Sequence, residues 1–435
     1  MNFIVMGAGY VGICTAINLA LRTDSIITVY DPDSSKISKF AEGKSPFFEQ
    51  DLEKELEKLT SNGQIRFFST GDLKNSEKLF DASFICVGTP ALSNGSTNLT
   101  YVNEALNTSC SRLKTNGKIF IRSSCPPHSI KDIEITLDTI SKRDIDLFFY
   151  PEFLREGTAI ADMKNPDRVI IGGSKKLNQD WIGYLAPLRT PYLLTTAYEA
   201  SLIKYANNSL LGTLITFANQ IAKLAEMSEH GADLDMVMKG VLLDRRWQID
   251  GKLPSITTYL QPGIGYGGSC LPKDIKALSA IHPNTSEVDF FRVIDILNEN
   301  RIHDFTNYLK KVIENIENKK VLIVGASFKE GTDDLRNSPG IRLSEVLSKF
   351  CEVKIVDNLV KNIESYEIGI EIISLENLIH KDYQPDVIIL THADKAFNDK
   401  VLSSVDNCQY VVKARNQKIS TLKNAKNLYL GGITK

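Results

Sequence analysis

The segment from Pro262 to Asp274 holds the residues of this sequence that are best suited to covalent chemistry. Four glycines lie within six residues there, at positions 263, 265, 267 and 268, so the backbone can turn sharply and approach a ligand closely. Cys270 follows at once, and then come Lys273 and Asp274. A cation near a thiol favours the thiolate, which is the nucleophilic form. On its own, the same pattern also fits an ordinary Gly-rich loop beside a buried cysteine.

A dinucleotide-binding pattern stands at the beginning of the sequence. The apolar run Asn2-Phe3-Ile4-Val5-Met6 predicts a strand, Gly7-Ala8-Gly9-Tyr10-Val11-Gly12 follows it, and a helix is expected over residues 13–21. Gly7 would make the tight turn, Gly9 would admit a pyrophosphate, and Gly12 would let the helix pack on the strand. A second strand over 25–30 leads to Asp31. Such a carboxylate, about 20 residues after the glycines, accepts ribose hydroxyls and repels a 2′-phosphate, so NAD is favoured over NADP.

The composition is that of an ordinary globular enzyme. The 435 residues suggest two or three domains, and 51 basic against 53 acidic residues give no general support for binding nucleic acid or membranes. No apolar stretch approaches the ~20 residues of a membrane span, and because a strand is predicted at residues 2–6, no signal peptide is expected. Seven cysteines without C-x-x-C spacing favour a reduced, cytoplasmic protein with no metal site. Five of them are expected to be small core residues: Cys14, Cys86, Cys110, Cys351 and Cys408.

Strands and helices alternate through about residue 195, which predicts a Rossmann-like domain at 1–195. Its further strands are expected at 84–90, 118–124, 147–150 and 169–173. Parallel strands with helices on both faces bind ligands beyond their carboxyl ends. Thr89 and Ser124 stand at such ends, where their hydroxyls could contact a cofactor. Ordinary turn-forming residues are the alternative interpretation.

The middle of the chain, 196–316, is expected to be an all-helical domain. Residues 196–231 contain no proline, and only Gly212 interrupts the helix formers before Gly231, a plausible C-cap. Lys204 and Asn208 lie four residues apart and so share one face, although most helix lysines face solvent. A second helical stretch is expected at about 287–316. Long paired helices of this kind would make a natural surface for a homodimer.

The third region, 317–435, returns to the α/β pattern. Buried strands are expected at 321–325, 354–357 and 386–390, and the second of these ends in an acid, as the strand before Asp31 does. The two α/β regions are therefore candidates for distant structural copies. The string Gly325-Ala326-Ser327-Phe328-Lys329 lacks a full G-x-G-x-x-G, so this domain is expected to bind a nucleotide by other contacts.

Taken together, these motifs resemble the nucleotide-sugar 6-dehydrogenases, which include the UDP-glucose and GDP-mannose dehydrogenases. The resemblance covers nearly the whole chain and rests on six blocks in order: residues 7–12, 87–90, 151–157, 203–208, 262–274, and 327–329 with 332–339. It implies an α/β fold of two Rossmann-like doubly wound parallel-sheet domains joined by a central helical domain, usually dimeric through that domain.

The family oxidises a sugar CH₂OH to a carboxylate in two hydride transfers to NAD⁺, through a cysteine thiohemiacetal and a thioester. The resemblance implies that Cys270 is the nucleophile and that Lys204 steadies the oxyanion. Asn208 and Asp274 would orient a water and assist proton transfer, and Glu156 would help to hydrolyse the thioester. Ser124 stands where the family often has Thr.

The resemblance also implies two sets of binding contacts. The cofactor contacts fall on Gly7, Gly9, Tyr10, Val11, Gly12, Asp31, Lys36, Thr89, Ser124, Glu156, Lys273 and Arg336. The substrate contacts fall on Glu152, Phe153, Leu154, Lys204, Asn208, Tyr259, Leu260, Gly263, Gly267 and Lys329.

Two departures from the family pattern affect this interpretation. Cys125 follows Ser124 and places a second thiol near the site, where we expect it to be packed and not catalytic. Relatives that act on UDP-glucose often carry an arginine that reaches the sugar across the dimer, but an ungapped match falls on Pro254, and Arg245 or Arg246 fits only with extra residues between.

The choice of sugar nucleotide is the least constrained expectation. Several motifs favour UDP-glucose, with GDP-mannose as the alternative, and Ser269 argues against the N-acetyl-hexosamine branch, which usually has a His there. A simple two-electron dehydrogenase and a non-catalytic nucleotide-binding relative are the remaining alternatives.

Overall fold

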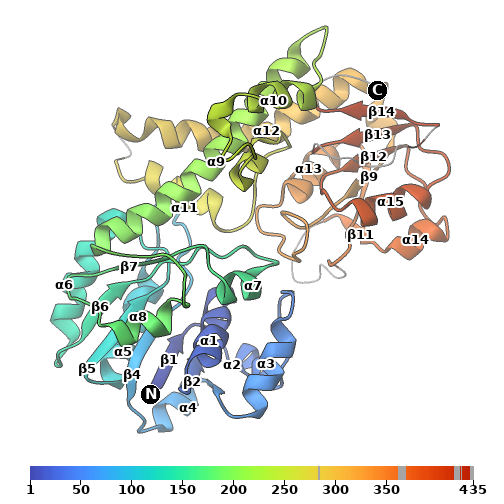
Figure 1. The fold of residues 1–435 in the computed structure, drawn as a ribbon. Helices are drawn as coiled ribbons and strands as arrows, with labels where there is room; N and C mark the ends of the chain where they lie inside the picture. The colour runs from blue at the N-terminus through green and yellow to red at the C-terminus, as the bar shows by residue number, and fades with distance from the viewer. Residues whose placement is uncertain (283–284, 361–368, 416–421, 423, 432–435) are drawn as a thin grey trace. The chain divides into compact units, whose positions relative to one another are not determined.

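The computed structural model describes residues 1–435 except 283–284, 361–368, 416–421, 423 and 432–435 (Figure 1). The chain forms two compact units. The first consists of Met1–Asn207 with Lys276–Asn284, and the second of Asn208–Ile275 with Thr285–Lys435. Two helices, α9 (Ala197–Met227) and α11 (Leu271–Ser279), continue from one unit into the other. The three-domain division with boundaries at 195 and 316 stays a prediction.

The first unit is built on an eight-stranded sheet in the order β3-β2-β1-β4-β5-β6-β7-β8. Its strand pairs are parallel except that β6 and β7 run antiparallel, where Phe149 pairs with Gly172. The strands are β1 (Asn2–Met6), β2 (Ile26–Tyr30), β3 (Ile65–Phe68), β4 (Phe80–Ile85), β5 (Leu113–Ile121), β6 (Asp146–Phe149), β7 (Val169–Gly172) and β8 (Tyr192–Thr195).

Helices cover both faces of this sheet, because its central strands are apolar on both sides. In β1, Phe3 and Val5 belong to one hydrophobic cluster, and Ile4 and Met6 belong to another. The helices of this unit are α1 (Tyr10–Arg22), α2 (Ser34–Ala41), α3 (Leu52–Ser61), α4 (Thr70–Asn75), α5 (Thr100–Arg112), the 3₁₀ turn η1 (Pro127–Ser129), α6 (Ile130–Ile140), α7 (Ala159–Lys164) and α8 (Gln179–Leu185).

The second unit carries a six-stranded parallel sheet in the order β11-β10-β9-β12-β13-β14. The strands are β9 (Lys320–Val324), β10 (Glu352–Val356), β11 (Glu371–Ile373), β12 (Val387–Leu390), β13 (Tyr410–Lys413) and β14 (Lys426–Tyr429). The helices and 3₁₀ turns are α10 (Leu234–Leu242), η2 (Arg245–Trp247), η3 (Ser255–Leu260), η4 (Ser286–Val288), α12 (Asp289–Val312), η5 (Ile316–Asn318), α13 (Pro339–Leu347), α14 (Leu375–Ile379) and α15 (Lys395–Ser403).

The long helix α9 is a single uninterrupted element. It begins after Thr196, whose hydroxyl accepts the Glu199 N–H while the Glu199 carboxylate accepts the Thr196 N–H, so the two side chains form a capping box. The helix ends at Met227, and Gly231 lies in the following loop with φ of 62°. The expectation that Gly231 caps this helix is therefore wrong, because the chain leaves the helix earlier.

The two sheets share one local device. Gly325 follows β9 with φ of 114°, as Gly7 follows β1 with φ of 102°. A Cβ added to Gly340 would lie 2.2 Å from the Gly325 carbonyl oxygen, so Gly340 packs α13 on β9. Gly340 therefore plays the packing role that Gly12 plays after β1, but a longer loop separates it from Gly325. This geometry supports the expectation that the two α/β regions are structural copies.

Candidate functional site

The Gly-rich turn after β1 has the geometry that a dinucleotide requires. Gly7 has φ of 102°, and a Cβ added to Gly12 would lie 1.9 Å from the Gly7 carbonyl oxygen. Gly9 immediately precedes α1, and a Cβ added there would meet no protein atom within 4 Å. Packing therefore explains Gly7 and Gly12, whereas the space beside Gly9 suits a close-approaching phosphate at a helix N-terminus. These residues fit NAD.

Asp31 lies at the end of β2 and is 7% exposed. Its Oδ2 accepts the Ala8 N–H at 2.8 Å, its Oδ1 accepts the Asp33 N–H at 3.0 Å, and Lys36 Nζ lies 3.3 Å from Oδ2. The carboxylate predicted to bind ribose therefore also fixes the Gly-rich turn. Sequence spacing placed Asp31 correctly beside the turn but did not reveal this bond. Asp357 repeats it in the second unit, where its Oδ2 accepts the Ala326 N–H at 2.7 Å.

Glu49 joins the dinucleotide turn to the segment that carries Glu156, and the sequence did not reveal it. Its Oε2 accepts the Tyr10 hydroxyl at 2.5 Å and the Gly157 N–H at 2.7 Å, while Oε1 accepts the Ala159 N–H at 2.9 Å. Burial, with the Glu49 hydrogen bond second, raises the pKa of Tyr10 well above its ordinary value, so the phenol stays a donor. Tyr10 is thereby fixed by the protein itself.

Glu152 and Lys204 form a buried ion pair in the first unit. Lys204 Nζ lies 2.9 Å from Glu152 Oε1 and donates to the Glu152 carbonyl oxygen at 2.7 Å. Lys204 is 4% exposed and Glu152 is 8% exposed, so this lysine does not face solvent as most helix lysines do. Burial opposes ionisation of Glu152, but the Lys204 charge and the Leu154 N–H outweigh it and lower the pKa of that carboxyl.

The Glu152–Lys204 pair predicts a pH-dependent stability difference. Lys204→Met would leave a buried carboxylate without its main cation, which costs about 3–5 kcal/mol near neutral pH. Because the pKa of Glu152 is lowered in the folded protein, the pair stabilises it above the unfolded pKa of ~4.3 and ceases to do so as the pH falls through the folded value. In the variant, protonation of Glu152 removes the penalty. The stability gap between wild type and variant should therefore shrink on acidification.

Urea unfolding of both proteins from about pH 7 to pH 4 measures that gap. Lys44→Met is the matched control, because Lys44 is 72% exposed and its pairing with Glu42 is a surface contact. A gap for Lys204→Met that stays constant over this range would show that Glu152 is not the titrating partner.

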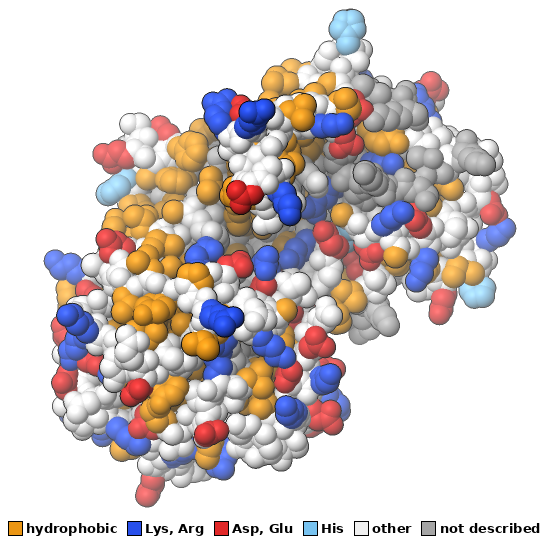
Figure 2. All heavy atoms as spheres, in the orientation of Figure 1, with side chains coloured by type: hydrophobic (Ala, Val, Ile, Leu, Met, Phe, Trp, Pro, Cys, Tyr) orange, Lys and Arg blue, Asp and Glu red, His pale blue; other side chains and the backbone are white. Residues whose placement is uncertain are grey.

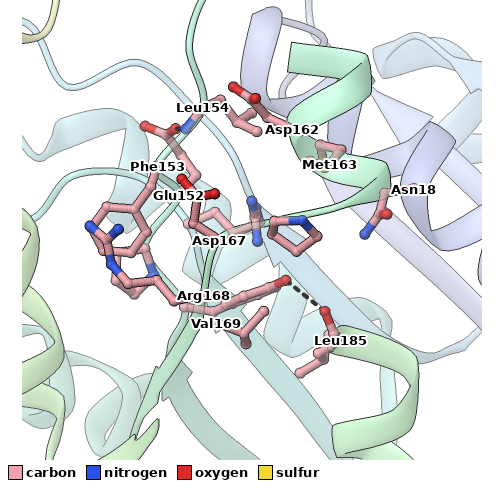
Figure 3. Close-up of a pocket in the computed structure, with 14 residues that line it drawn as sticks. Asn18, Glu152, Phe153, Leu154, Asp162, Met163, Asp167, Arg168, Val169 and Leu185 are labelled. Atoms are coloured by element: carbon pink, nitrogen blue, oxygen red, sulfur yellow. Dashed lines mark hydrogen bonds between the residues drawn. The ribbon is translucent and has the colours of Figure 1, made fainter. Parts of the chain in front are cut away.

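A cavity of about 50 Å³ adjoins Glu152, and Figure 3 shows Glu152, Phe153 and Arg168 along it. The Arg168 guanidinium lies 4.0 Å from the Phe153 ring centroid and donates to Asn207 Oδ1 at 2.8 Å. Arg122, 5% exposed, lies over the Tyr150 ring at 4.1 Å. Arg122 is a further cation that lowers the pKa of Glu152. This cluster was not evident from the sequence, because its members come from four separate segments.

The two hydroxyl residues predicted at strand ends lie in the first unit. Thr89 is 7% exposed, and Ser124 is partly buried, with its carbonyl oxygen accepting the Tyr205 hydroxyl at 3.3 Å. Cys125 is 3% exposed, and its carbonyl oxygen accepts the Ser201 hydroxyl at 2.5 Å. The expectation that Cys125 is packed is confirmed. Cys14, Cys86 and Cys408 are also buried, whereas Cys110 and Cys351 are only partly buried.

In the second unit, the structure brings the predicted nucleophile together with three of its predicted partners. Cys270 is exposed and directly precedes α11, and the Asp274 N–H donates to its carbonyl oxygen at 2.9 Å. Asp274 is fully buried and accepts Asn208 Nδ2 at 2.6 Å and Lys273 Nζ at 2.5 Å. The Ser269 hydroxyl lies 3.6 Å from Cys270 Sγ. A thiol with a lysine and a helix N-terminus nearby is a candidate nucleophile.

The glycines of the 262–268 loop are enforced by close packing. A Cβ on Gly267 would lie 2.1 Å from the Asn337 carbonyl oxygen, and one on Gly268 would lie 2.9 Å from the Phe328 ring. Asn337 Nδ2 donates to the Gly268 carbonyl oxygen at 3.0 Å, another contact the sequence did not reveal. The loop that precedes Cys270 is therefore held against the segment 327–337.

The remaining predicted binding residues lie in the second unit. Tyr259 and Leu260 end the 3₁₀ turn η3, and Leu260 is 3% exposed. Arg336 is exposed, and its guanidinium grips the Asp334 carboxylate through Nε at 2.9 Å and Nη2 at 2.6 Å. Lys329 is partly buried in the loop after β9, with its Nζ 5.7 Å from the Phe328 ring centroid.

The described residues also bear on metal binding and on membrane insertion. They contain no group of three or more His, Cys, Asp or Glu side chains placed to hold a metal ion. Among the same residues, no helix combines the length and apolar character needed to cross a membrane.

Models of the UDP-glucose/GDP-mannose dehydrogenase family match residues 1–185 as its NAD binding domain, 198–300 as its central domain and 322–418 as its UDP binding domain. A UDP-glucose 6-dehydrogenase of Rhizobium meliloti is 34% identical over 80% of this chain and 79% of its own. The chain belongs to the UDP-glucose/GDP-mannose dehydrogenase family.

Solved structures agree with membership of the UDP-glucose/GDP-mannose dehydrogenase family. A UDP-glucose dehydrogenase from Pyrobaculum islandicum matches with a TM-score of 0.85 at 26% identity, over 99% of this chain and 97% of its own. A GDP-mannose dehydrogenase from Pseudomonas aeruginosa matches with a TM-score of 0.52 at 29% identity, over 98% and 99%. The expected fold class is confirmed, and the chain is an NAD-dependent dehydrogenase of this family.

Proposed function

We propose that this enzyme oxidises the C6 hydroxymethyl group of UDP-glucose to a carboxylate, giving UDP-glucuronate. The observation that carries the proposal is the exposed Cys270 at the start of α11, with Asp274 held by Asn208 and Lys273. A carbon that is oxidised twice without release needs a covalent anchor, and a thiolate is nucleophilic at neutral pH where a serine hydroxyl is not. The UDP binding domain and the relatives named as UDP-glucose dehydrogenases favour a UDP-sugar over GDP-mannose.

The proposed sequence balances in atoms and electrons. Oxidation of the alcohol releases a hydride and a proton and gives an aldehyde, to which the Cys270 thiolate adds as a thiohemiacetal. Loss of a second hydride gives a thioester, and water then releases the carboxylate and restores the thiol. NAD⁺, when bound, accepts each hydride. Lys204 would stabilise the oxyanion, and Asn208 with Asp274 would orient the water.

The test is to mix the purified protein with NAD⁺ and either UDP-glucose or GDP-mannose and to follow NADH by absorbance. UDP-glucose alone should be oxidised, with two NADH formed per sugar. One NADH per sugar would indicate a simple two-electron dehydrogenase, and oxidation of GDP-mannose alone would show that the sugar nucleotide is wrong. No reduction with either would favour a non-catalytic relative.

We also propose that the enzyme is a homodimer through the helices of its second unit. On α9, Leu210, Phe217 and Leu224 recur every seven residues and are 53%, 49% and 65% exposed. On α12, Phe290 and Val293 are 59% and 50% exposed. Figure 2 shows hydrophobic side chains gathered at the surface over α10 and the first part of α12. Apolar stripes of this kind mark interaction surfaces.

If these stripes pair two copies, Phe217→Glu should convert the dimer to a monomer, because a charge would be buried at the centre of the interface. Sedimentation velocity measures the change. Leu188→Glu is the control, since Leu188 is 94% exposed but lies outside α9, α10 and α12. An unaltered dimer in Phe217→Glu would place the interface elsewhere, and a monomeric wild type would refute the proposal.

A further inference from the structure

Four buried polar side chains from two helices hold the Gly-rich loop before Cys270: three hydrogen-bond to its backbone, and the fourth pairs with one of these three. Asn219 and Glu226 come from α9 and are 2% and 6% exposed, and Asn298 and Arg301 come from α12 and are 3% and 0% exposed. We call these four residues the loop clamp. All four belong to the same compact unit as the loop and Cys270.

Arg301 is the centre of the loop clamp. Its Nε donates to the Gly263 carbonyl oxygen at 2.8 Å, while Nη1 and Nη2 donate to the two carboxylate oxygens of Glu226 at 2.7 and 2.8 Å. The guanidinium thus uses one edge to hold a forked ion pair and its Nε to hold the loop backbone. Only arginine has the planar set of donors that serves both partners at once.

The two asparagines complete the grip on the loop backbone. Asn219 Oδ1 accepts the Gly263 N–H at 2.7 Å. Asn298 Oδ1 accepts the Tyr266 N–H at 2.9 Å, and its Nδ2 donates to the Tyr266 carbonyl oxygen at 3.1 Å. Both polar backbone groups of Gly263 and of Tyr266 therefore have protein partners. The family resemblance predicts that Gly263 contacts the substrate, but both of its backbone polar groups already bond to Asn219 and Arg301.

A buried ion pair such as Arg301–Glu226 is not explained by stability alone. Desolvating two charges costs several kcal/mol, and apolar replacements of similar volume are often neutral or stabilising. The pair is more readily explained by what it positions. Only the residues between Gly263 and Cys270 separate this pair from the nucleophile along the chain. Helix α9 also holds the far end of the segment, because Asn208 donates to Asp274.

We propose that Arg301 is a positioning residue for the nucleophile: through Gly263 and Glu226 it fixes the Gly-rich loop and so the placement of Cys270. The inference deepens the proposed function and rests on it for the catalytic role of Cys270. The loop geometry itself can be tested without turnover. A misplacement of about 1 Å in a reacting group can cost roughly 100-fold in rate, so loosening the loop should lower kcat.

The decisive variant replaces the pair with apolar side chains of similar length, Glu226→Met with Arg301→Met. This change leaves no buried charge unpaired, so the double variant should fold. We expect amide hydrogen exchange in residues 262–269 to become at least about 10-fold faster while the sheet strands β9 and β12 stay protected. We also expect kcat with UDP-glucose to fall roughly 10- to 100-fold with little change in the KM for NAD⁺.

The chain offers a matched control that links the same two helices. The Lys223 ammonium on α9 lies 2.9 Å from the Asp304 carboxylate on α12, and these side chains are 34% and 19% exposed, whereas Arg301 and Glu226 are buried. Lys223→Met with Asp304→Met should leave loop exchange and kcat unchanged. Arg301→Lys keeps the charge beside Glu226 but cannot also reach Gly263, so it should reproduce the faster loop exchange, even where the double variant does not fold.

Wild-type loop exchange and wild-type kcat in a folded Arg301 variant would overturn the inference. Faster exchange that is equally large in β9 and β12 would also overturn it, because it would reflect general destabilisation. The two proposals fail separately. A wild-type enzyme that does not oxidise UDP-glucose refutes the proposed function, whereas the exchange comparison still decides whether Arg301 holds the loop.

Discussion

Replacing Cys270 with serine should lower steady-state NADH formation from UDP-glucose by at least about 10³-fold. The physical reason is nucleophilicity: a serine hydroxyl beside Lys273 and Asp274 stays protonated at neutral pH and cannot capture the aldehyde. Because Cys270 is exposed and its side chain fills no core, the variant should unfold at nearly the wild-type temperature. Absorbance assays and thermal unfolding of the same preparations measure both effects.

The stoichiometry of the reaction sharpens this prediction. Without the covalent anchor, the first oxidation can still occur but the second cannot, so Cys270→Ser should form at most one NADH per UDP-glucose and then stall. Single-turnover measurements with enzyme in excess over UDP-glucose would show it. Full turnover by Cys270→Ser, with two NADH per sugar, would remove the thioester from the mechanism.

Cys125 provides the matched control, since it is the second thiol in the predicted site region. It is 3% exposed and packs in the hydrophobic core of the first unit. Cys125→Ala should therefore cost about 1 kcal/mol or more of stability while leaving NADH formation close to wild type. The two substitutions should thus have opposite effects. Cys270→Ser should lose activity without destabilisation, and Cys125→Ala should lose stability without loss of activity.

The parts of this molecule that sequence predicted well are those whose geometry is set by neighbours along the chain. The strand, glycines, helix and acid from Asn2 to Asp31 follow one another directly, so their spacing alone fixes how they fold. The Gly-rich loop before Cys270 is also local. Gly212 interrupts α9 without breaking it, as expected for a lone glycine in a long run of helix formers.

The residues that sequence missed act through pairs distant in the chain. Glu49 binds Tyr10 and Gly157, and Arg301 binds Gly263 and Glu226. Nothing in the local sequence around a glutamate or an arginine distinguishes a buried clamp from a solvated surface charge. Lys204 shows the same limit, because its burial depends on Glu152, which lies in a separate strand-end segment.

The antiparallel pairing of β6 and β7 was unpredictable for a related reason. Both strands are short apolar runs, and an apolar run does not reveal its direction. Direction depends on the connection, which here contains only α7 (Ala159–Lys164) and irregular chain. That connection carries Glu152 and Glu156, so the departure from a parallel sheet occurs at the segment with two of the predicted site residues.

Substitutions at Gly9 and at Gly12 in the dinucleotide turn should weaken NAD⁺ binding for different reasons. In Gly9→Val, the new side chain starts where a Cβ meets no protein atom within 4 Å, so the fold should be unchanged. The same side chain would occupy the space through which a pyrophosphate reaches the backbone. We expect NAD⁺ affinity to fall at least about 100-fold, equivalent to about 2.8 kcal/mol, with an unaltered unfolding temperature.

Gly12→Ala should show the reverse order of effects. Its Cβ would lie 1.9 Å from the Gly7 carbonyl oxygen, a backbone atom that cannot move without displacing α1 from β1. Overpacking of this kind costs about 1–3 kcal/mol or more, so the unfolding temperature should fall, and NAD⁺ binding should weaken as a consequence. Calorimetric titration with NAD⁺ and thermal unfolding, performed on both variants, separate the two cases.

Gly183 supplies the control for glycine replacement in the same unit. It lies in α8, where an added Cβ also meets nothing within 4 Å, but no ligand is expected there. Gly183→Ala should leave NAD⁺ affinity unchanged and add up to about 1 kcal/mol of stability, because alanine is the better helix former. An added Cβ meets no protein atom within 4 Å at either glycine. Weaker NAD⁺ binding by Gly9→Val with an unaltered unfolding temperature would therefore indicate that the new side chain obstructs the ligand. Equal affinity in Gly9→Val and wild type would mean that the pyrophosphate does not pass over this turn.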